Sequence, residues 1–352
     1  MSYKKYDFGN APDGVPVEMI EIKNSNGMTA KLLTYGAILN SLYVPDKNGN
    51  MTDVVLGYDK LEPYFDNEAG YGSIIGRNAN RIANASFVLN GKKYNLEKNE
   101  GTTNLHSGFL GYHKRVWYHE IYEDELGTGV AFSYYSINGD QGFPGNLNVT
   151  VTYILTEDNS LIINYYAVPD EDTVINMTNH SYFNLSGHNS GSALDHKVWI
   201  DSDKITCADE KAIPDGREIP VKGTPFDFNT PKRVGDDINS DYDQIVWGKG
   251  YDRNFVLKTV KGRASLVAKV TDDKSGREMD IYTDLPGLQM YTGNYLGTSG
   301  MGKDGYVYKD YDGIAFEAQF PPNAINIKEF PQPVTKANER YEYVVMYRFK
   351  NI

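Results

Sequence analysis

The feature that most constrains this chain is an alternation of apolar and polar side chains with a period of two residues. Apolar residues occupy every second position over 147–155, and the pattern returns over 161–167 after a turn-like stretch at 156–160. Period-two alternation puts one face of a β-strand in a core and leaves the other face polar. The two runs therefore predict an antiparallel hairpin, and residues 341–349 predict a further strand.

The rest of the chain extends the same pattern. Residues 87–94 contain two short strand-like runs on either side of Asn90-Gly91, which is a strong hairpin signal. Turn-forming clusters recur roughly every ten residues, as expected for sandwiches and barrels. No long amphipathic helix, Pro/Ser-rich linker or internal repeat interrupts the pattern. We predict an all-β protein: one domain over residues 1–352, folded as a large antiparallel β-sandwich with few short helices.

Composition narrows the class of protein. The 28 Tyr and 14 Phe residues favour strands, and the net charge of −12 argues against binding to nucleic acid. Neither a signal-peptide core nor an apolar run long enough to span a bilayer is evident. Cys207 is the only cysteine, so an intramolecular disulfide cannot form. We expect a soluble cytoplasmic protein with no nucleic-acid or membrane partner.

One segment imitates a phosphate-binding loop. Residues 297–304, GTSGMGKD, have the two glycines and the lysine at the required spacing. Asp304 replaces the Ser or Thr that would hold magnesium, and the residues that follow do not resemble a helix. We therefore expect a flexible glycine-rich loop and no nucleotide site.

The residue that is hardest to explain structurally is Glu317. It stands in an otherwise apolar strand-like run, 314–320, where burial of a carboxylate is costly unless something compensates it. Alternation puts Glu317 and Gln319 on one side of that strand, opposite Phe316, Ala318 and Phe320. A carboxylate on the floor of a dry cleft has a raised pKa and can serve as a general base.

Other polar residues scattered along the chain could join Glu317 in a site. A structural role is possible for each one: a histidine can be hydrogen-bonded in the core, an arginine paired, and an aspartate can cap a turn. Together they suit a neutral ligand with several hydroxyl groups. We find no metal-ligand spacing, nucleophile motif or cofactor fingerprint, and we predict neither a cofactor nor a metal. The candidates are Asn80, Arg81, His106, His180, Asp252 and Gln289.

Eight segments in order along nearly the whole chain resemble the aldose 1-epimerase (galactose mutarotase) family. The family fold is a large β-sandwich of antiparallel strands, which agrees with the alternation. The resemblance implies an isomerase that interconverts the α and β anomers of free hexoses such as galactose and glucose. The segments are LTYGAILNSLYVPDKNG (33–49), DVVLGYD (53–59), GRNANRI (76–82), NLHSGFLGYHKRVW (104–117), TNHSYFNLSG (178–187), YDRNFVL (251–257), LQMYTGNYL (288–296) and FEAQFPPNAIN (316–326).

Position by position, the resemblance implies that His180 is the general acid and Glu317 the general base. In the starting state of the reaction His180 would then be protonated and Glu317 ionised. Tyr182 is expected to lie against the sugar. The partner would be a small aldose, and the protein a monomer or weak homodimer. The residues implied to hold the sugar hydroxyls and ring are Asn80, Arg81, His106, Asp252 and Gln289.

The chain departs from the family pattern at two positions. Arg253 stands where His is commoner, which could alter specificity or tune Asp252, and Ser107 stands where Gly is commoner. Arg77 is a rival to Arg81 for the sugar-binding role, although the Asn-Arg-Ile match favours Arg81.

Three alternative functions stay open at this stage. A sugar-binding or sensor protein would not need the His180/Glu317 pair. A mutarotase for phosphorylated hexoses would need an extra cation, for which Arg253 is a candidate. A glycoside hydrolase would use two carboxylates, such as Asp252 and Glu317.

Overall fold

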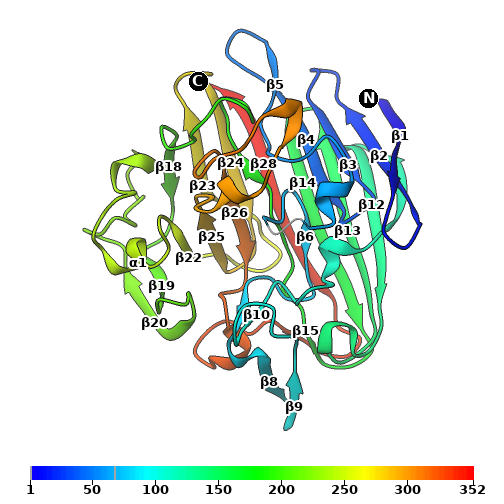
Figure 1. The fold of residues 1–352 in the computed structure, drawn as a ribbon, viewed down its shortest axis with the longest axis vertical. Coiled ribbons are helices and arrows are strands. Elements are labelled where there is room, and N and C mark those ends of the chain that lie inside the picture. Colours follow the sequence, from blue (N-terminus) through cyan, green and yellow to red (C-terminus); the bar gives the residue numbers. More distant parts are fainter. Residues whose placement is uncertain (1, 67–68) are drawn as a thin grey trace.

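The computed structural model describes residues 2–66 and 69–352, and its largest element is a nine-stranded antiparallel sheet (Figure 1). The sheet carries the two patterns with which the sequence analysis began. In spatial order its strands are β11 (Tyr118–Glu123), β12 (Gly127–Ser136), β13 (Leu147–Thr156), β14 (Ser160–Pro169), β28 (Tyr341–Asn351), β24 (Arg277–Thr283), β23 (Ser265–Asp272), β18 (Lys197–Ile200) and β21 (Lys232–Arg233).

Two further sheets complete the main body. The six-stranded sheet has the order β17 (Tyr182–Phe183), β26 (Ile314–Gln319), β25 (Gly287–Tyr291), β22 (Asp252–Val256), β19 (Lys204–Ala208) and β20 (Pro214–Pro220). The five-stranded sheet contains β1 (Ser2–Asn10), β2 (Pro16–Lys23), β3 (Thr29–Leu33), β4 (Ile38–Pro45) and β5 (Met51–Asp53).

Short strand pairs and single helical turns connect these sheets. The pairs are β6 (Ile74–Ile75) with β16 (Thr178–Asn179), β7 (Arg81–Ile82) with β10 (Asn104–Leu105), β8 (Ser86–Leu89) with β9 (Lys92–Asn95), and β15 (Thr173–Val174) with β27 (Val334–Thr335). The α-helix α1 spans Asp243–Val246, and 3-10 turns span Glu62–Tyr64, Ala83–Ala85, Tyr112–Lys114, Asp140–Gly142, Val234–Asp236, Leu296–Thr298, Lys303–Gly305 and Ala324–Asn326. None of the helices in the described ranges has the length and apolar character needed to cross a bilayer.

The predicted hairpins are confirmed. Strands β13 and β14 pair antiparallel, with Val151 opposite Tyr165. Strands β8 and β9 are joined through Asn90 and Gly91, whose φ angles of 51° and 78° are those a tight hairpin turn requires. The all-β prediction is confirmed as well, because the strands dominate and the only α-helix of the described residues is four residues long.

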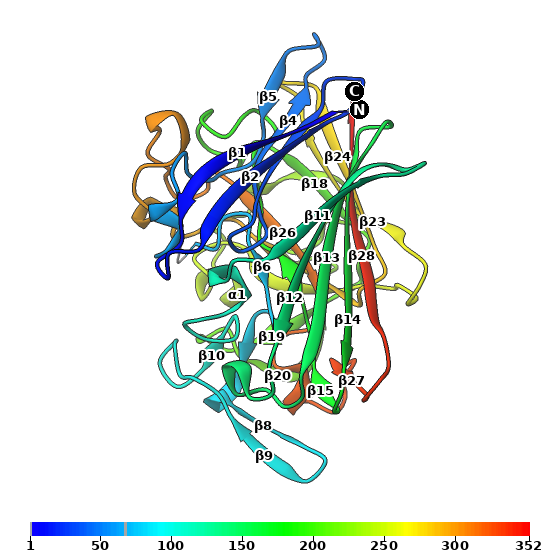
Figure 2. The ribbon, with the colours of Figure 1, turned by 90° about the vertical axis from the view of Figure 1, so that its right-hand side faces the viewer.

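The core lies between the three large sheets. Leu42 from β4, Val151 from β13 and Phe316 from β26 belong to one continuous cluster of buried apolar side chains. In Figure 2 strands β12, β13, β14 and β28 run side by side on one side of the molecule, with β26 and β6 across from them. The other face of the six-stranded sheet is covered in part by a second apolar cluster, which includes Tyr182 of β17 and Ala315 of β26, and the polar residues beside that cluster are available for a site.

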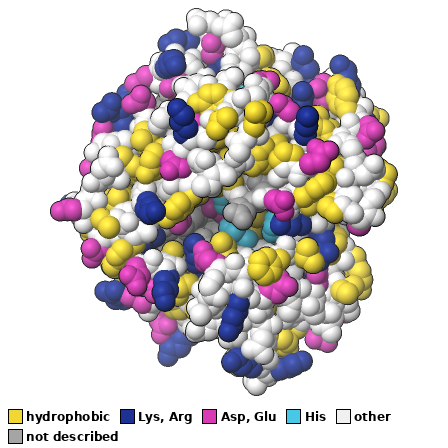
Figure 3. Space-filling view, viewed as in Figure 1, with side chains coloured by type: hydrophobic (Ala, Val, Ile, Leu, Met, Phe, Trp, Pro, Cys, Tyr) yellow, Lys and Arg dark blue, Asp and Glu magenta, His cyan; other side chains and the backbone are white. Residues whose placement is uncertain are grey.

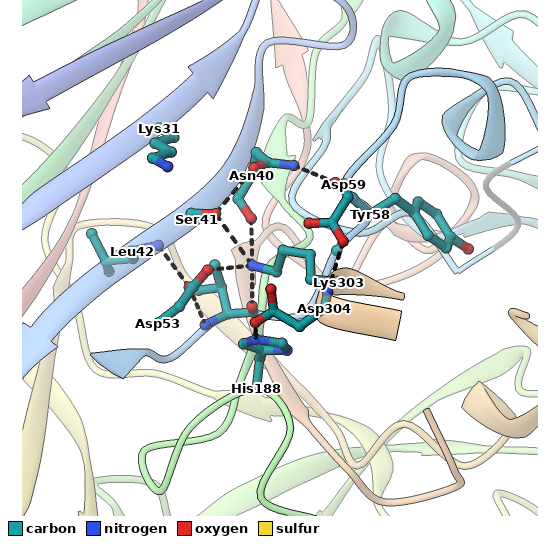
Figure 4. A network of polar contacts seen from close by, with 12 residues as sticks. Lys31, Asn40, Ser41, Leu42, Asp53, Tyr58, Asp59, His188, Lys303 and Asp304 are labelled. Carbon is teal, nitrogen blue, oxygen red and sulfur yellow. Dashed lines mark hydrogen bonds and ion pairs between the residues drawn. The ribbon is translucent and has the colours of Figure 1, made fainter. Parts of the chain in front are cut away.

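The loop that imitates a phosphate-binding motif is not flexible at its lysine, and that part of the prediction is wrong. Lys303 is buried, and its Nζ donates hydrogen bonds to Asp53 Oδ2 at 2.6 Å, Val55 O at 2.7 Å and Asn40 O at 2.8 Å (Figure 4). Its ammonium group thus ties the glycine-rich segment to strands of the five-stranded sheet. A lysine committed to the protein interior in this way cannot hold a phosphate.

Candidate active site

Two very short strands bring His180 to Glu317. His180 lies between β16 and β17, and its backbone N–H donates to Ser73 O at 2.9 Å. Strand β17 pairs with β26, with Tyr182 directly opposite Ala315. Glu317 is two residues beyond Ala315 on β26 and so faces the same side. Residues 137 positions apart in the sequence therefore meet because β17 forms the edge of the six-stranded sheet.

The two side chains are in direct reach of each other and both are buried. His180 Nε2 lies 3.5 Å from Glu317 Oε1, and the residues are 6% and 2% exposed. Burial lowers the pKa of His180 to about 4, although Asp252 opposes this shift. Burial and the negative charge of Asp252 raise the pKa of Glu317 to about 8, against the pull of Arg81.

These shifts act against the charges that the acid–base assignment requires. Burial favours a neutral imidazole and a protonated carboxyl, whereas the assignment starts from an imidazolium and a carboxylate. Both arrangements contain one proton and have the same net charge. Between about pH 4 and about 8 the His180/Glu317 pair therefore holds a single proton, whichever partner carries it.

His106 is fixed beside this pair by a reciprocal contact with Asn80. His106 Nδ1 accepts a hydrogen bond from the Asn80 N–H, and the His106 N–H donates to Asn80 O, both at 3.1 Å. The rings of His106 and His180 meet edge to face, with centroids 5.3 Å apart. Because Nδ1 accepts, the neutral His106 ring carries its proton on Nε2 and is a hydrogen-bond donor.

The tautomer of His106 also bears on metal binding. Ligand atoms of His106, His180 and Glu317 lie within 4.8 Å of one another, which is a possible three-ligand cluster. A metal on His106 Nε2 would need the other tautomer, and that tautomer would turn Nδ1 into a donor facing the Asn80 N–H. The Asn80 contact therefore suits a ring that donates to a hydroxyl group better than one that binds a metal.

Ser107, one of the two departures from the family pattern, has a structural role. Its hydroxyl accepts from the Asn78 N–H at 2.7 Å and donates to Asn78 O at 3.0 Å. Both bonds hold the His106 loop against the segment that carries Asn80. The serine adopts a φ of 69°, a conformation that glycine adopts more easily.

Asp252 and Gln289 act as a pair on the face that carries Glu317. Gln289 Nε2 donates to Asp252 Oδ1 at 2.6 Å, and Gln289 is directly paired with Glu317 across β25 and β26. Asp252 lines the cavity in front of the sheet, whereas Gln289 is not among the lining residues. The structure thus places Gln289 behind Asp252, where it orients the carboxylate.

The three arginines discussed above occupy different places. Arg81 lines the cavity and is held by Glu100 through two hydrogen bonds of 2.7 Å. Arg77 is fully buried, and its guanidinium group donates to Pro144 O at 2.7 Å, away from the cavity. The Asn-Arg-Ile match thus selected the arginine that faces the cavity.

Arg253 lies on the opposite face of β22 from Asp252. Its neighbours in register, Met290 on β25 and Phe316 on β26, belong to the core. Its Nε donates to Gln244 Oε1 and one terminal nitrogen donates to the Asp252 carbonyl oxygen, both at 2.6 Å. Arg253 therefore does not reach a ligand in the cavity, and its contact with Asp252 is through the backbone.

The cavity in front of Glu317 has a volume of about 920 Å³. In Figure 3 histidine side chains lie in the hollow at the centre of the face. Seven of the predicted site residues line it, which are Asn80, Arg81, His106, His180, Tyr182, Asp252 and Glu317. The rings of Tyr182 and His180 lie 5.1 Å apart, so Tyr182 forms part of the wall beside the acid–base pair.

Sequence analysis missed several lining residues. Tyr291 follows Gln289 by two positions on β25, so alternation alone could have placed it on the site face. Glu100 and Phe109 come from irregular segments and His113 from the 3-10 turn Tyr112–Lys114, where no strand alternation indicates the direction of a side chain.

Comparison with known proteins identifies the family. The family model for aldose 1-epimerase matches residues 18–348. The chain belongs to the aldose 1-epimerase family. This assignment confirms the prediction from the eight sequence segments and makes the protein an isomerase. Curated relatives agree: galactose mutarotase of Sus scrofa is 38% identical over 343 residues, covering 97% of each chain, and aldose 1-epimerase of Escherichia coli is 38% identical over 342 residues, covering 96% of this chain and 97% of its own.

Solved structures of aldose 1-epimerase relatives have the same fold. An aldose epimerase homologue from C. elegans superimposes with a TM-score of 0.86 at 31% identity, covering 95% of this chain and 99% of its own. Galactose 1-epimerase from Lactobacillus acidophilus gives a TM-score of 0.87 at 28% identity, covering 100% and 99%. The predicted large β-sandwich is thus confirmed by proteins of known structure.

Proposed function

We propose that this aldose 1-epimerase interconverts the anomers of free hexoses, with galactose and glucose as substrates, through His180 and Glu317. The observation that carries the proposal is the 3.5 Å separation of His180 Nε2 and Glu317 Oε1 at the base of a cavity. The two reacting oxygens of a hemiacetal, O1 and O5, are bonded to the same carbon. An acid and a base that act on both must therefore lie close together, as these two do.

The reaction requires two coupled proton transfers. Glu317 takes the proton of the C1 hydroxyl while His180 gives a proton to O5, and the C1–O5 bond breaks to leave an open-chain aldehyde. After C1–C2 rotates by about half a turn, the reverse transfers close the ring on the other face of the carbonyl. Each positioned group contributes about 10²–10⁴-fold, so the pair accounts for catalysis without a cofactor. The ring-closing step returns both groups to their starting protonation states.

The remaining cavity residues hold the sugar while C1 turns. Arg81, His106 and Asn80 present donors or amide groups on one wall, and Asp252 presents an acceptor on another. The tautomer of His106, with its proton on Nε2, suits donation to a ring or hydroxyl oxygen. Gln289 supports this binding through Asp252.

The test is polarimetry on freshly dissolved α-D-galactose and α-D-glucose, with glucose 6-phosphate as a comparison. We expect the protein to accelerate the mutarotation of both free sugars. Galactose binding without acceleration would favour a sugar-binding protein instead. A preference for the phosphorylated sugar would overturn the free-hexose assignment. Arg253, the cation that the sequence suggested for binding a sugar phosphate, gives no support to that alternative, because its side chain faces the core.

We also propose a single 352-residue domain that is a monomer or weak homodimer and acts in the cytoplasm on galactose or related hexoses. The single cysteine, which is buried and unpaired, supports the cytoplasmic assignment, because disulfides are rare in cytosolic proteins. Light scattering at two protein concentrations tests the oligomeric state, and a single cooperative unfolding transition tests the single domain.

A further inference from the structure

A second group of polar side chains lies next to Glu317 on the site face of the six-stranded sheet. Asn254, Gln289 and Glu317 are directly opposite one another across β22, β25 and β26. Gln319 is the next residue of β26 on that face. Asn254 and Gln319 are 1% and 0% exposed and do not line the cavity.

Most polar atoms of this group lack a hydrogen-bond partner among residues 2–66 and 69–352. Both amide atoms of Asn254 and both of Gln319 are unpartnered, as are Gln289 Oε1 and Glu317 Oε2. Buried polar atoms without partners are rare in folded proteins. Six of them on two adjacent rows of one sheet face point to a shared ligand.

A glycine makes room for this group. Gly287 is directly opposite Gln319, and a Cβ added to Gly287 would collide with Asn254 Oδ1. The Asn254 amide therefore lies over Gly287, in space that any larger residue would occupy. This position directs Asn254 from its own row toward Gln319.

The mixture of atoms identifies the ligand. The unpartnered set contains acceptors, including Glu317 Oε2 and Gln289 Oε1, and donors, namely the amide nitrogens of Asn254 and Gln319. A cation would satisfy only the oxygens, and an anion would satisfy only the N–H groups. Water donates and accepts, and buried waters typically make about three hydrogen bonds to otherwise unsatisfied groups. The assignment to water holds even if either amide is rotated by 180°.

We propose that Asn254, Gln289 and Gln319 are positioning residues that hold buried water against Glu317 Oε2 and thereby stabilise the ionised carboxylate. The inference depends on the proposed role of Glu317 as the general base. Water that donates a hydrogen bond to Oε2 favours the charged form. It therefore opposes the burial that otherwise keeps the proton on Glu317.

Groups around Glu317 do not replace this hydration. His180 faces Oε1, Asp252 repels the carboxylate and Arg81 attracts it from a distance without a hydrogen bond. None of the described residues donates a hydrogen bond to Oε2. The charged and titratable groups facing Glu317 are Arg81, His106, His180, Tyr182, Asp252 and, from the nine-stranded sheet, Tyr347.

The first experiment removes the amide at Gln319 without changing its bulk. We expect Gln319→Met to move the limb of the kcat/KM pH profile that Glu317 controls upward by about one pH unit, because a hydrogen bond to a charged group is lost. Gln319→Asn retains an amide and leaves room for water, so in this variant the Glu317 limb of the kcat/KM pH profile should stay near that of the wild type. Gln244→Met is the matched control: Gln244 is a buried glutamine that bonds Arg253 and lies outside the cavity.

The outcomes separate hydration from a structural role. An upward shift of the limb that Glu317 controls, seen in Gln319→Met and not in Gln244→Met, supports the proposal, whereas a shift of only the limb that His180 controls overturns it. Loss of thermal stability with an unchanged pH profile overturns it. If Gln319→Met does not fold, a wild-type crystal structure decides, because ordered water must lie within hydrogen-bond distance of Gln319 and Glu317 Oε2. Full turnover by Glu317→Gln would refute the proposed function, whereas the crystallographic water is independent of that result.

Discussion

Two buried ionic groups of this protein, Lys303 and Glu317, have opposite surroundings. The ammonium group of Lys303 forms an ion pair with Asp53 and donates hydrogen bonds to backbone carbonyl oxygens. Figure 4 shows how these groups converge on it. Glu317 has one oxygen near His180 and the other without a partner among the described residues. Their side chains are similarly buried, at 5% and 3% exposed.

The difference separates a structural charge from a reactive one. A buried charge whose hydrogen bonds are complete has little to gain from a ligand, and it stabilises one arrangement of the chain. A buried carboxylate that lacks hydrogen bonds from the rest of the protein has a displaced pKa, which suits proton transfer. Burial alone therefore does not indicate function, and the hydrogen bonds must be counted.

The largest effect is expected at the reactive charge. Glu317→Gln, and separately His180→Asn, should lower kcat for α-D-galactose by about 10²–10⁴-fold, because each removes one proton-transfer group. Circular dichroism should show that both variants remain folded. Polarimetry is the measurement, and turnover close to wild type in either variant would remove that residue from the mechanism.

Removal of the structural charge should affect stability more than chemistry. Lys303→Met leaves the Asp53 carboxylate buried without its ion pair, so we expect a loss of about 3–5 kcal/mol in the free energy of unfolding. Urea denaturation measures this loss. The double variant Lys303→Met/Asp53→Asn should recover part of it, since the uncompensated charge is removed. A single variant as stable as wild type would contradict the structural role.

The pH dependence of stability sharpens the comparison. Because the pKa of Glu317 is raised in the folded protein, the stability that comes from keeping this group neutral is complete below the unfolded pKa of 4.5. It is lost as the pH rises toward about 8. Glu317→Gln should therefore match wild type near pH 4 and be more stable by roughly 1–3 kcal/mol near pH 8. The proposed buried water reduces this difference in stability between Glu317→Gln and wild type. A difference that becomes smaller as the pH rises would contradict the raised pKa of Glu317.

The smallest expected effect is on KM, and it is tested with two arginines on opposite sides of the sheet. Arg81→Ala should raise KM for galactose about tenfold, because a charged hydrogen-bond donor leaves the cavity. Arg253→Met is the control, and its KM should change by less than about twofold since the side chain faces the core. Equal changes in both variants would show that Arg81 does not contact the sugar.

Sequence patterns identified the strands and most of the site for different reasons. Period-two alternation reports which face of a strand is buried, so the β13–β14 hairpin and the outward direction of Glu317 and Gln319 followed directly. Seven of the site residues were first noted as polar residues in unusual places, and the resemblance to a family gave them their roles and added Tyr182. Seven of these eight residues line one cavity. Gln289 was assigned to the sugar but lies behind Asp252, because alternation gives the face of a strand and not the depth of a side chain.

The sequence by itself determined the class of fold, the hairpins and the unusual presence of a carboxylate in an apolar strand. Only the tertiary structure decided that Lys303 is an anchor, that Arg253 faces the core and that His180 reaches Glu317. The physical reason is that alternation is a local property of a strand, whereas the partners of a buried charge come from strands that are distant in sequence and meet only through sheet pairing.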